Sequence, residues 1–273
     1  MKILSICSTE YNSEQAKGII YWLNGNKDSR VLKLPNIHNL IYSYFILIIY
    51  FVFLRWFTFV KIEKKYTCVI VTGRSVVAQA IIIADQLSVP IRTVQKPFGY
   101  PWFLFEYQYI PYHDLSKFPA SNQIPTLLAP NTMEYKINYN KEKKISILLG
   151  GSIHNKSYNT DNIHKEISQY QNNKKYKDYK LEVIVSRRTP ETLKREIKSK
   201  NIEINDIYGA TKDAYYNSEI LVITDDSFCM ISEAIQSGRI PFIIDTKNNS
   251  ERLKKGIKIL LEKKLVMYNN EFK

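Results

Sequence analysis

Short apolar runs alternate with amphipathic polar segments along most of this chain. The apolar run 2–8 is followed by a helix-like segment at 12–23, which Asn12 or Ser13 can cap, and by a second apolar run at 30–34. This strand, helix, strand order is how a parallel sheet with helices on its faces begins. The same analysis predicts further strands at 67–71, 90–94, 107–110 and 124–128, and a helix at 76–87.

A second series of the same kind starts after Ala129-Pro130-Asn131. Strands are expected at 144–149, 181–185, 220–223 and 241–244, with helices at 161–170, 190–198, 229–236 and 249–262. The repeated rhythm predicts an α/β fold of two Rossmann-like lobes whose parallel sheets face a central cleft. We place the N-terminal lobe at 1–130 and the C-terminal lobe at 131–273.

The most apolar segment is 37–60, and its centre, 44–54, carries no charge before Arg55. It is borderline in length for a bilayer span, and a span here would divide one sheet between two sides of a membrane. We therefore expect a helix that is buried in the lobe or lies in the membrane interface, with Arg55, Lys61, Lys64 and Lys65 near anionic headgroups. A core helix without a membrane role is the alternative.

Composition indicates the cellular compartment of the protein and the kinds of partner that it can bind. The first apolar run is too short for a signal peptide, and three widely spaced cysteines do not form a disulfide framework, which predicts a cytoplasmic protein, peripheral on the inner face of the membrane. A net charge of +13 favours anionic partners. The sequence has no basic stripe with ordered aromatic residues, so we do not expect it to bind nucleic acid. There is no zinc-type cluster or Asp-x-Asp motif, so we expect no metal and no cofactor.

Three segments of the second half are candidates for an anion site. Gly150-Gly151-Ser152 follows a strand, so its backbone N–H groups can approach a phosphate, although a simple turn explains it equally well. Ser186-Arg187-Arg188-Thr189-Pro190 joins a strand to a helix, where the arginines can grip a diphosphate, Ser186 and Thr189 can donate hydrogen bonds, and Thr189 can cap the helix. A capped helix with two exposed arginines is the alternative.

The third segment, 224–233, also joins a strand to a helix. Asp226 or Ser227 can cap this helix, Ser227 and the following amides can meet phosphate, and Glu233 can accept hydrogen bonds from ribose or sugar hydroxyls. The alternative is a helix cap followed by a surface glutamate.

The first half offers two candidates at strand ends. Thr72-Gly73-Arg74 opens a helix, and His113-Asp114 follows a strand. His113 is the best general-base candidate in the chain, with Asp114 next to it, although a His-Asp dipeptide is more often structural.

With these residues in place, the chain resembles the Elongated Mitochondria (mitochondrial fission) family, whose bacterial members are similar to two-lobed B-type glycosyltransferases. The resemblance implies a GT-B-like arrangement, with the acceptor or membrane side in the lobe 1–130 and a nucleotide-sugar site in the lobe 131–273. The sugar nucleotide is then a substrate, and Thr224 and Met230 are added to its site. The chain departs from the family at 8–15, where a glycine-containing loop is usual. The motifs that carry the resemblance are Thr72-Gly73-Arg74, Val94-Gln95, Pro111-x-His113-Asp114, Ala129-Pro130-Asn131, Leu148 to Gly151, Ser186 to Pro190 and Thr224 to Ala234.

Two functions follow as hypotheses. The first is a metal-independent, inverting glycosyltransferase at a membrane surface. Arg187, Arg188, Ser227 and Glu233 hold the donor, and His113 or Asp114 deprotonates a hydroxyl of the acceptor, which can be lipid-linked. The second is a non-catalytic membrane-associated adaptor, because plant members of the family look like surface adaptors for the fission machinery.

Overall fold

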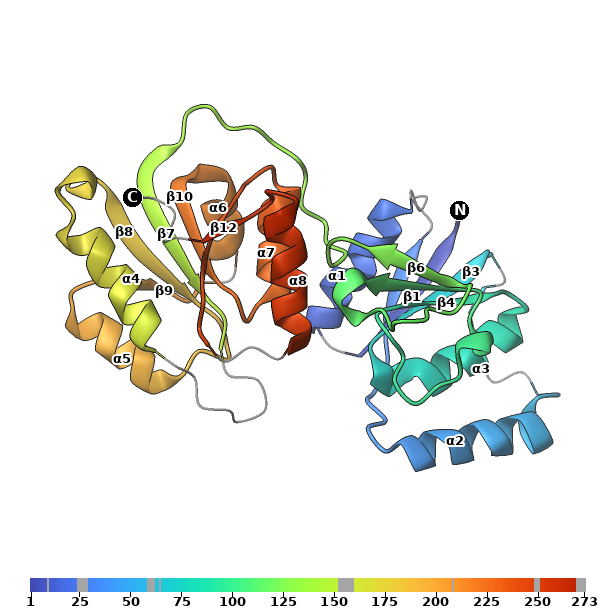
Figure 1. Ribbon diagram of the computed structural model, residues 1–273. Coiled ribbons are helices and arrows are strands. Elements are labelled where there is room, and N and C mark those ends of the chain that lie inside the picture. Colours follow the sequence, from blue (N-terminus) through green and yellow to red (C-terminus); the bar gives the residue numbers. More distant parts are fainter. Residues whose placement is uncertain are drawn as a thin grey trace. The chain divides into compact units, whose positions relative to one another are not determined.

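The chain forms two compact units, residues 1–132 and 133–273 (Figure 1). The computed structural model describes residues 1–8, 10–23, 29–57, 62–63, 65–151, 160–207, 209–247 and 251–268. Along the chain, the first unit ends at Thr132 and the second begins at Met133. We predict this boundary at residue 130.

The first unit is built on a parallel sheet of six strands in the order β2-β1-β3-β4-β5-β6. All residues of β1 and β3 are buried, as expected for strands with a helix layer on each face. This explains why both strands read as unbroken apolar runs in the sequence. The strands are β1 (Ile3–Cys7), β2 (Arg30–Lys33), β3 (Cys68–Thr72), β4 (Ile91–Val94), β5 (Tyr107–Pro111) and β6 (Gln123–Thr126).

Helices cover both faces of this first sheet. Ile19 of α1 (Glu10–Trp22) packs on one face, and α3 (Val77–Leu87) packs on the other, preceded by the 3-10 turn η2 (Arg74–Val76). The predicted start of α1 at Asn12 was wrong, because the helix begins at Glu10 and Asn12 lies within it. Two further 3-10 turns, η3 (Trp102–Leu104) and η4 (Tyr112–Asp114), precede and follow β5.

A third layer lies outside α3 in this unit. It consists of α2 (Leu40–Ile49) and the π-helical turn η1 (Tyr50–Leu54), and α2 packs on α3 as Figure 1 shows. Ser43, Leu47 and Tyr50 are buried on its inner side, with the spacing of one helix face. The hypothesis of a core helix is therefore wrong, because most of the apolar residues from 41 to 57 are exposed. None of the helices among the described residues is long and apolar enough to cross a bilayer.

The second unit repeats the architecture, with a parallel six-stranded sheet in the order β12-β11-β10-β7-β8-β9. Helices α4 and α5 pack on one face, while α6, α7 and α8 cover the other (Figure 1). The strands are β7 (Glu142–Leu149), β8 (Lys180–Val185), β9 (Glu203–Asn205), β10 (Ser218–Thr224), β11 (Phe242–Ile244) and β12 (Met267–Tyr268). The helices are α4 (Asp161–Asn172), η5 (Lys174–Tyr176), α5 (Glu191–Ser199), α6 (Ala210–Asn217), α7 (Phe228–Gln236) and α8 (Glu251–Glu262).

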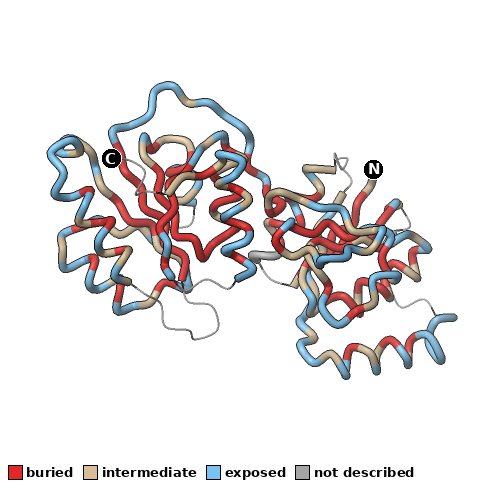
Figure 2. The backbone as a smooth tube through the Cα atoms, viewed as in Figure 1, coloured by how far each residue is buried: buried red, intermediate tan, exposed pale blue. Residues whose placement is uncertain are grey.

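Each unit has its own hydrophobic core along its sheet. Figure 2 shows buried positions concentrated on the strands and on the inner sides of the helices, while exposed positions run through residues 51–57. The predicted α/β fold of two Rossmann-like units with parallel sheets is confirmed. Three short elements, β9, α6 and β12, were not predicted.

Candidate functional site

The candidate site lies where the strand order of the second sheet reverses. From β7 the chain moves outward through β8 and β9, then returns to the other side of β7 and continues through β10, β11 and β12. In open parallel sheets, ligands bind at the carboxyl ends of the strands beside such a switch point. Here Gly150 and Gly151 follow β7, and Thr224 to Ser227 end β10 and lead into α7.

The two glycines hold the strand ends together. The N–H of Gly150 donates to the Thr224 hydroxyl at 2.8 Å, and the N–H of Gly151 donates to a carboxylate oxygen of Asp226 at 2.5 Å. From the sequence we expect both N–H groups to approach a phosphate. In the structure each already has an internal acceptor, so the amides serve the geometry of the site. Ser152 lies outside the described residues.

Both positions require glycine because the backbone is crowded. A Cβ added at Gly150 would collide with the Asp226 carboxylate, and one added at Gly151 would collide with the backbone carbonyl of Arg188. The three segments after β7, β8 and β10 therefore touch one another at this point. The sequence hypothesis that these segments gather at one edge of the sheet agrees with this geometry.

Two hydroxyl groups fix the loop after β8. The Ser186 and Thr189 hydroxyls each donate to the carbonyl of Gly150 at 2.6 Å, and Thr189 also accepts a hydrogen bond from the Ser186 N–H at 2.9 Å. We had expected both side chains to face a ligand, but they anchor the loop. Thr189 is also not the cap of α5, since Pro190 occupies the N-cap position and the helix begins at Glu191.

The two arginines of this loop are exposed, while the backbone around them is fixed. The N–H of Arg188 donates to the Ser186 hydroxyl at 3.2 Å, and its guanidinium is close enough to Asp226 to favour the charged form of that carboxylate. Arg187 and Arg188 are thus available cations on a rigid base, the arrangement that favours bidentate contacts with phosphate oxygens.

Asp226 is the most unusual residue of the site. It is 6% exposed, and its buried Oδ1 atom has no hydrogen-bond partner among the residues that the structure describes, while the carboxylate binds the Gly151 N–H. Burial raises the pKa of Asp226, although bonds from Thr224 and Gly151 and the charge of Arg188 oppose this. A buried polar atom without a partner is costly, so a bound ligand that donates to it would be stabilised.

The start of α7 completes the site. Ser227 is the N-cap residue, as predicted, but its side chain makes no capping hydrogen bond. Met230 lies half-buried in the first turn. Glu233, expected to bind sugar hydroxyls, instead accepts a hydrogen bond at 2.9 Å from the hydroxyl of Tyr215, a buried residue of α6. Asp226 is therefore better suited to a ligand hydroxyl than Glu233.

Asp225, next to the site, has a raised pKa that makes its contribution to stability depend on pH. Burial, followed by repulsion from Asp245 and Asp226, raises its pKa to about 6, even though its Oδ1 accepts hydrogen bonds from the N–H and hydroxyl of Thr246. The folded protein therefore binds this proton more tightly than the unfolded chain. The contribution of Asp225 to stability is greatest below about pH 4, falls as the pH rises to about 6, and is constant above that.

We expect Asp225→Asn to stabilise the protein at pH 8, by up to about 3 kcal/mol, because the amide oxygen keeps both bonds from Thr246 and carries no charge. Thermal unfolding of both proteins from pH 4 to 8 measures this. The two melting curves should converge near pH 4 and separate as the pH rises. An equal pH dependence in the variant would contradict the assignment.

The candidate general bases of the first unit, His113 and Asp114, are almost completely buried. The side chain of His113 is 3% exposed and that of Asp114 5%, and His113 Nε2 lies 3.8 Å from Asp114 Oδ2. Both follow β5, two strands away from the switch point between β1 and β3. Thr72 and Gly73 lie at that switch point, where the buried Thr72 hydroxyl has no hydrogen-bond partner in the part of the chain that the structure describes. Gly73 has φ of 99°, which favours glycine.

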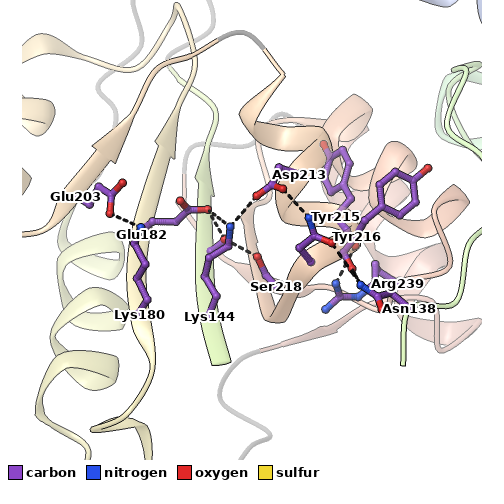
Figure 3. A network of polar contacts seen from close by, with 12 residues as sticks. Asn138, Lys144, Lys180, Glu182, Glu203, Asp213, Tyr215, Tyr216, Ser218 and Arg239 are labelled. Carbon is purple, nitrogen blue, oxygen red and sulfur yellow. Dashed lines mark hydrogen bonds and ion pairs between the residues drawn. The ribbon is translucent and has the colours of Figure 1, made fainter. Parts of the chain in front are cut away.

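The amino ends of the second sheet hold a polar cluster that the sequence did not reveal (Figure 3). The ammonium of Lys144 lies 2.7 Å from Asp213 and 3.3 Å from Glu182, and Glu182 also accepts a hydrogen bond from Ser146 at 2.7 Å. Burial disfavours the charged lysine, but the two carboxylates outweigh it and raise the pKa of Lys144. This end of the sheet is closed by ion pairs, in contrast to the carboxyl end.

No group of three or more His, Cys, Asp or Glu side chains that could hold a metal ion occurs among the residues that the structure describes. The candidate site itself consists of Arg187, Arg188, Asp226 and the start of α7.

Two Rossmann-like units with parallel sheets, and polar residues at a strand-order reversal, define a protein of the GT-B fold class. The chain belongs to the mitochondrial fission ELM1 family, whose model matches residues 35–271. It is 30% identical over 165 residues to the uncharacterized protein RP120 of Rickettsia prowazekii (strain Madrid E), a match that covers 56% of this chain and 46% of that protein. The chain thus spans about half the length of this relative.

Solved structures agree with the fold. A UDP-N-acetylglucosamine 2-epimerase matches with a TM-score of 0.51 at 11% identity, covering 94% of this chain and 81% of that one. The UDP-GlcNAc 2-epimerase of Methanocaldococcus jannaschii matches with a TM-score of 0.49 at 15% identity, covering 96% and 93%. At these identities the likeness concerns the fold alone.

Proposed function

We propose that the second unit binds a nucleotide sugar and that the protein is a metal-independent glycosyltransferase acting at a membrane surface. The observation that carries the proposal is the meeting of Gly150, Gly151, Arg188 and Asp226 at the switch point of the second sheet. One buried Asp226 oxygen there has no partner within the described part of the chain. A cationic loop, a helix start and an unsatisfied acceptor together suit an anionic ligand that also carries hydroxyl groups.

Each part of the ligand has a matching group. Arg187 and Arg188 would bind the diphosphate, with the N-terminal end of α7 and the Ser227 hydroxyl contributing positive potential and a donor. Asp226 Oδ1 would accept a hydrogen bond from a hydroxyl of the ribose or of the transferred sugar, which requires this buried atom to become accessible. The internal bonds of Gly150, Ser186 and Thr189 would hold these groups in place before the ligand arrives.

Glycosyl transfer would proceed by displacement at the anomeric carbon. The bond between that carbon and the diphosphate oxygen breaks, the acceptor hydroxyl oxygen bonds to the carbon, and the hydroxyl proton passes to a base. The arginines and the helix dipole stabilise the charge that develops on the leaving diphosphate. For the base we retain His113, with Asp114 as its neighbour, which requires the nearly closed imidazole to become accessible.

Calorimetric titration with UDP, ADP, GDP, CDP and dTDP tests the binding step. We expect one of these to bind, and Arg188→Ala to weaken it roughly tenfold to a hundredfold, because a charge-assisted contact with phosphate is lost. Arg195→Ala is the matched control, since Arg195 is an exposed arginine of α5 in the same unit. Binding of no diphosphate, or equal losses in both variants, would refute the proposal.

A non-catalytic membrane adaptor is the second candidate. It is favoured by the near-complete burial of His113 and by the segment 8–15, which contains no glycine after the first strand. Lipid binding by a protein that binds no nucleoside diphosphate would support the adaptor, whereas binding of a diphosphate with the arginine dependence above would support the enzyme.

A further inference from the structure

An extended apolar surface covers the outer side of α2 and the turn that follows it. Trp56 is 88% exposed and Ile41 82%, and the neighbouring positions are also exposed and apolar. The set comprises Ile41, Tyr42, Phe45, Ile48, Phe51, Val52, Phe53, Leu54, Trp56 and Phe57, and we call it the α2 surface. Large contiguous apolar patches are uncommon on soluble proteins and mark interaction sites.

The helix beneath this surface is firmly attached to the unit. The hydroxyl of Tyr50 donates to Asp85 of α3 at 2.8 Å, and the guanidinium of Arg55 binds the same carboxylate at 2.9 Å. Leu47 is buried against the core. The α2 surface is therefore displayed on a fixed helix, which keeps its apolar side chains together without a partner.

A second group of exposed aromatic residues adjoins α2. Tyr44 stacks on Tyr100 with ring centroids 5.6 Å apart and donates its hydroxyl proton to the carbonyl of Gly99. The segment before η3 adds Phe98, η3 itself adds Trp102 and Phe103, and the loop before β6 adds Phe118, which is 83% exposed. Phe98, Trp102 and Phe118 are among the residues that line a pocket of about 650 Å³.

The charges around these aromatic residues are cationic. The ammonium of Lys96 lies 5.5 Å from the centre of the Phe98 ring, that of Lys117 lies 5.8 Å from Phe118, and the Arg55 guanidinium lies 5.7 Å from Phe51. Between residues 30 and 65 the sequence has six Lys and Arg and one acid, Glu63. Exposed aromatic rings with cations beside them are the pattern of side chains that sit at lipid headgroups.

We propose that the α2 surface, with Phe98, Trp102, Phe103 and Phe118, docks the first unit onto an anionic lipid bilayer. The fifteen residues of α2 and η1, ten and five, extend about 22 Å, which is shorter than the hydrocarbon core, so the helix lies in the plane of the interface. Its apolar side enters the headgroup boundary while the neighbouring cations contact lipid phosphates. This proposal deepens the membrane part of the proposed function and rests on contacts within residues 1–132.

Vesicle flotation tests the docking surface with the full chain. We expect the protein to float with vesicles of phosphatidylcholine and phosphatidylglycerol, less with phosphatidylcholine alone, and less in high salt. Ile48→Asp with Val52→Asp should reduce the bound fraction about tenfold or more, because two exposed apolar contacts are replaced by charges that the lipid repels. Tyr139→Asp with Ile240→Asp, also exposed but in the second unit, is the matched control and should float like the wild type.

Two readouts keep this test separate from the nucleotide proposal. Melting temperature and diphosphate titration should be unchanged in the α2 variant, which shows that the variant is folded and that loss of lipid binding is specific. Flotation unaffected by the α2 substitutions, or absent from all vesicles, would overturn the proposal. So would a wild-type dimer, seen by light scattering, that becomes monomeric in the variant without any vesicle binding, because a second copy would then cover the surface.

Discussion

Replacing Gly151 by alanine is expected to disable the candidate site and to destabilise the protein by about 1–3 kcal/mol. The added Cβ would collide with the backbone carbonyl of Arg188, and backbone atoms cannot move aside as a side-chain end can. The loop after β8 would then shift, and with it the two arginines. We expect diphosphate affinity to fall at least about tenfold, as measured by the calorimetric titration above.

Gly209→Ala is the control for this substitution. A Cβ at Gly209 meets no other atom, but the residue has φ of 95°, so the change carries only a backbone cost of about 1 kcal/mol. The control should therefore lose some stability and keep its nucleotide affinity. Unchanged affinity in Gly151→Ala would mean that the loop after β8 does not hold the ligand.

The largest expected effect on stability comes from Lys144. Its ammonium joins Glu182, whose side chain is 5% exposed, to the half-exposed Asp213 (Figure 3). Lys144→Ala leaves the buried Glu182 carboxylate without its cation, which should destabilise the protein by about 3 kcal/mol. Chemical denaturation at pH 7 measures this.

Lys180→Ala provides the comparison. Lys180 forms an ion pair of similar length, 2.8 Å, with Glu203, but both side chains are more than half exposed. Solvent screens such a pair, so its loss should cost less than about 1 kcal/mol. Equal effects of the two lysine substitutions would show that burial does not set the strength of the Lys144 cluster.

The repeating pattern of strands and helices predicted both sheets because buried parallel strands are continuous apolar runs. The missed elements lack that signal. The strand Glu203–Asn205 has three residues with none fully buried, and α6 is an eight-residue helix that mixes polar and aromatic residues. The beginnings of α1 and α5 were displaced by one or two residues because a capping side chain in the sequence was assumed to cap its nearest helix.

The location of the candidate site could be predicted better than its contacts. Parallel strands bring their carboxyl ends to one edge, so the segments after β7, β8 and β10 had to be neighbours. Which group each hydroxyl binds depends on atomic packing. Ser186 and Thr189 therefore proved to anchor Gly150, and Glu233 proved to bind Tyr215. The Lys144 cluster could not be predicted because its members come from three separate elements, β7, β8 and α6.

The central claim is that a nucleoside diphosphate binds at the reversal of the second sheet. Hydrogen–deuterium exchange of the wild-type protein, with and without the diphosphate that binds in titration, tests it most directly. We expect the diphosphate to slow exchange in peptides covering 149–151, 186–190 and 224–230, with no change at the Lys144 end of the sheet. Protection confined to other segments would contradict it.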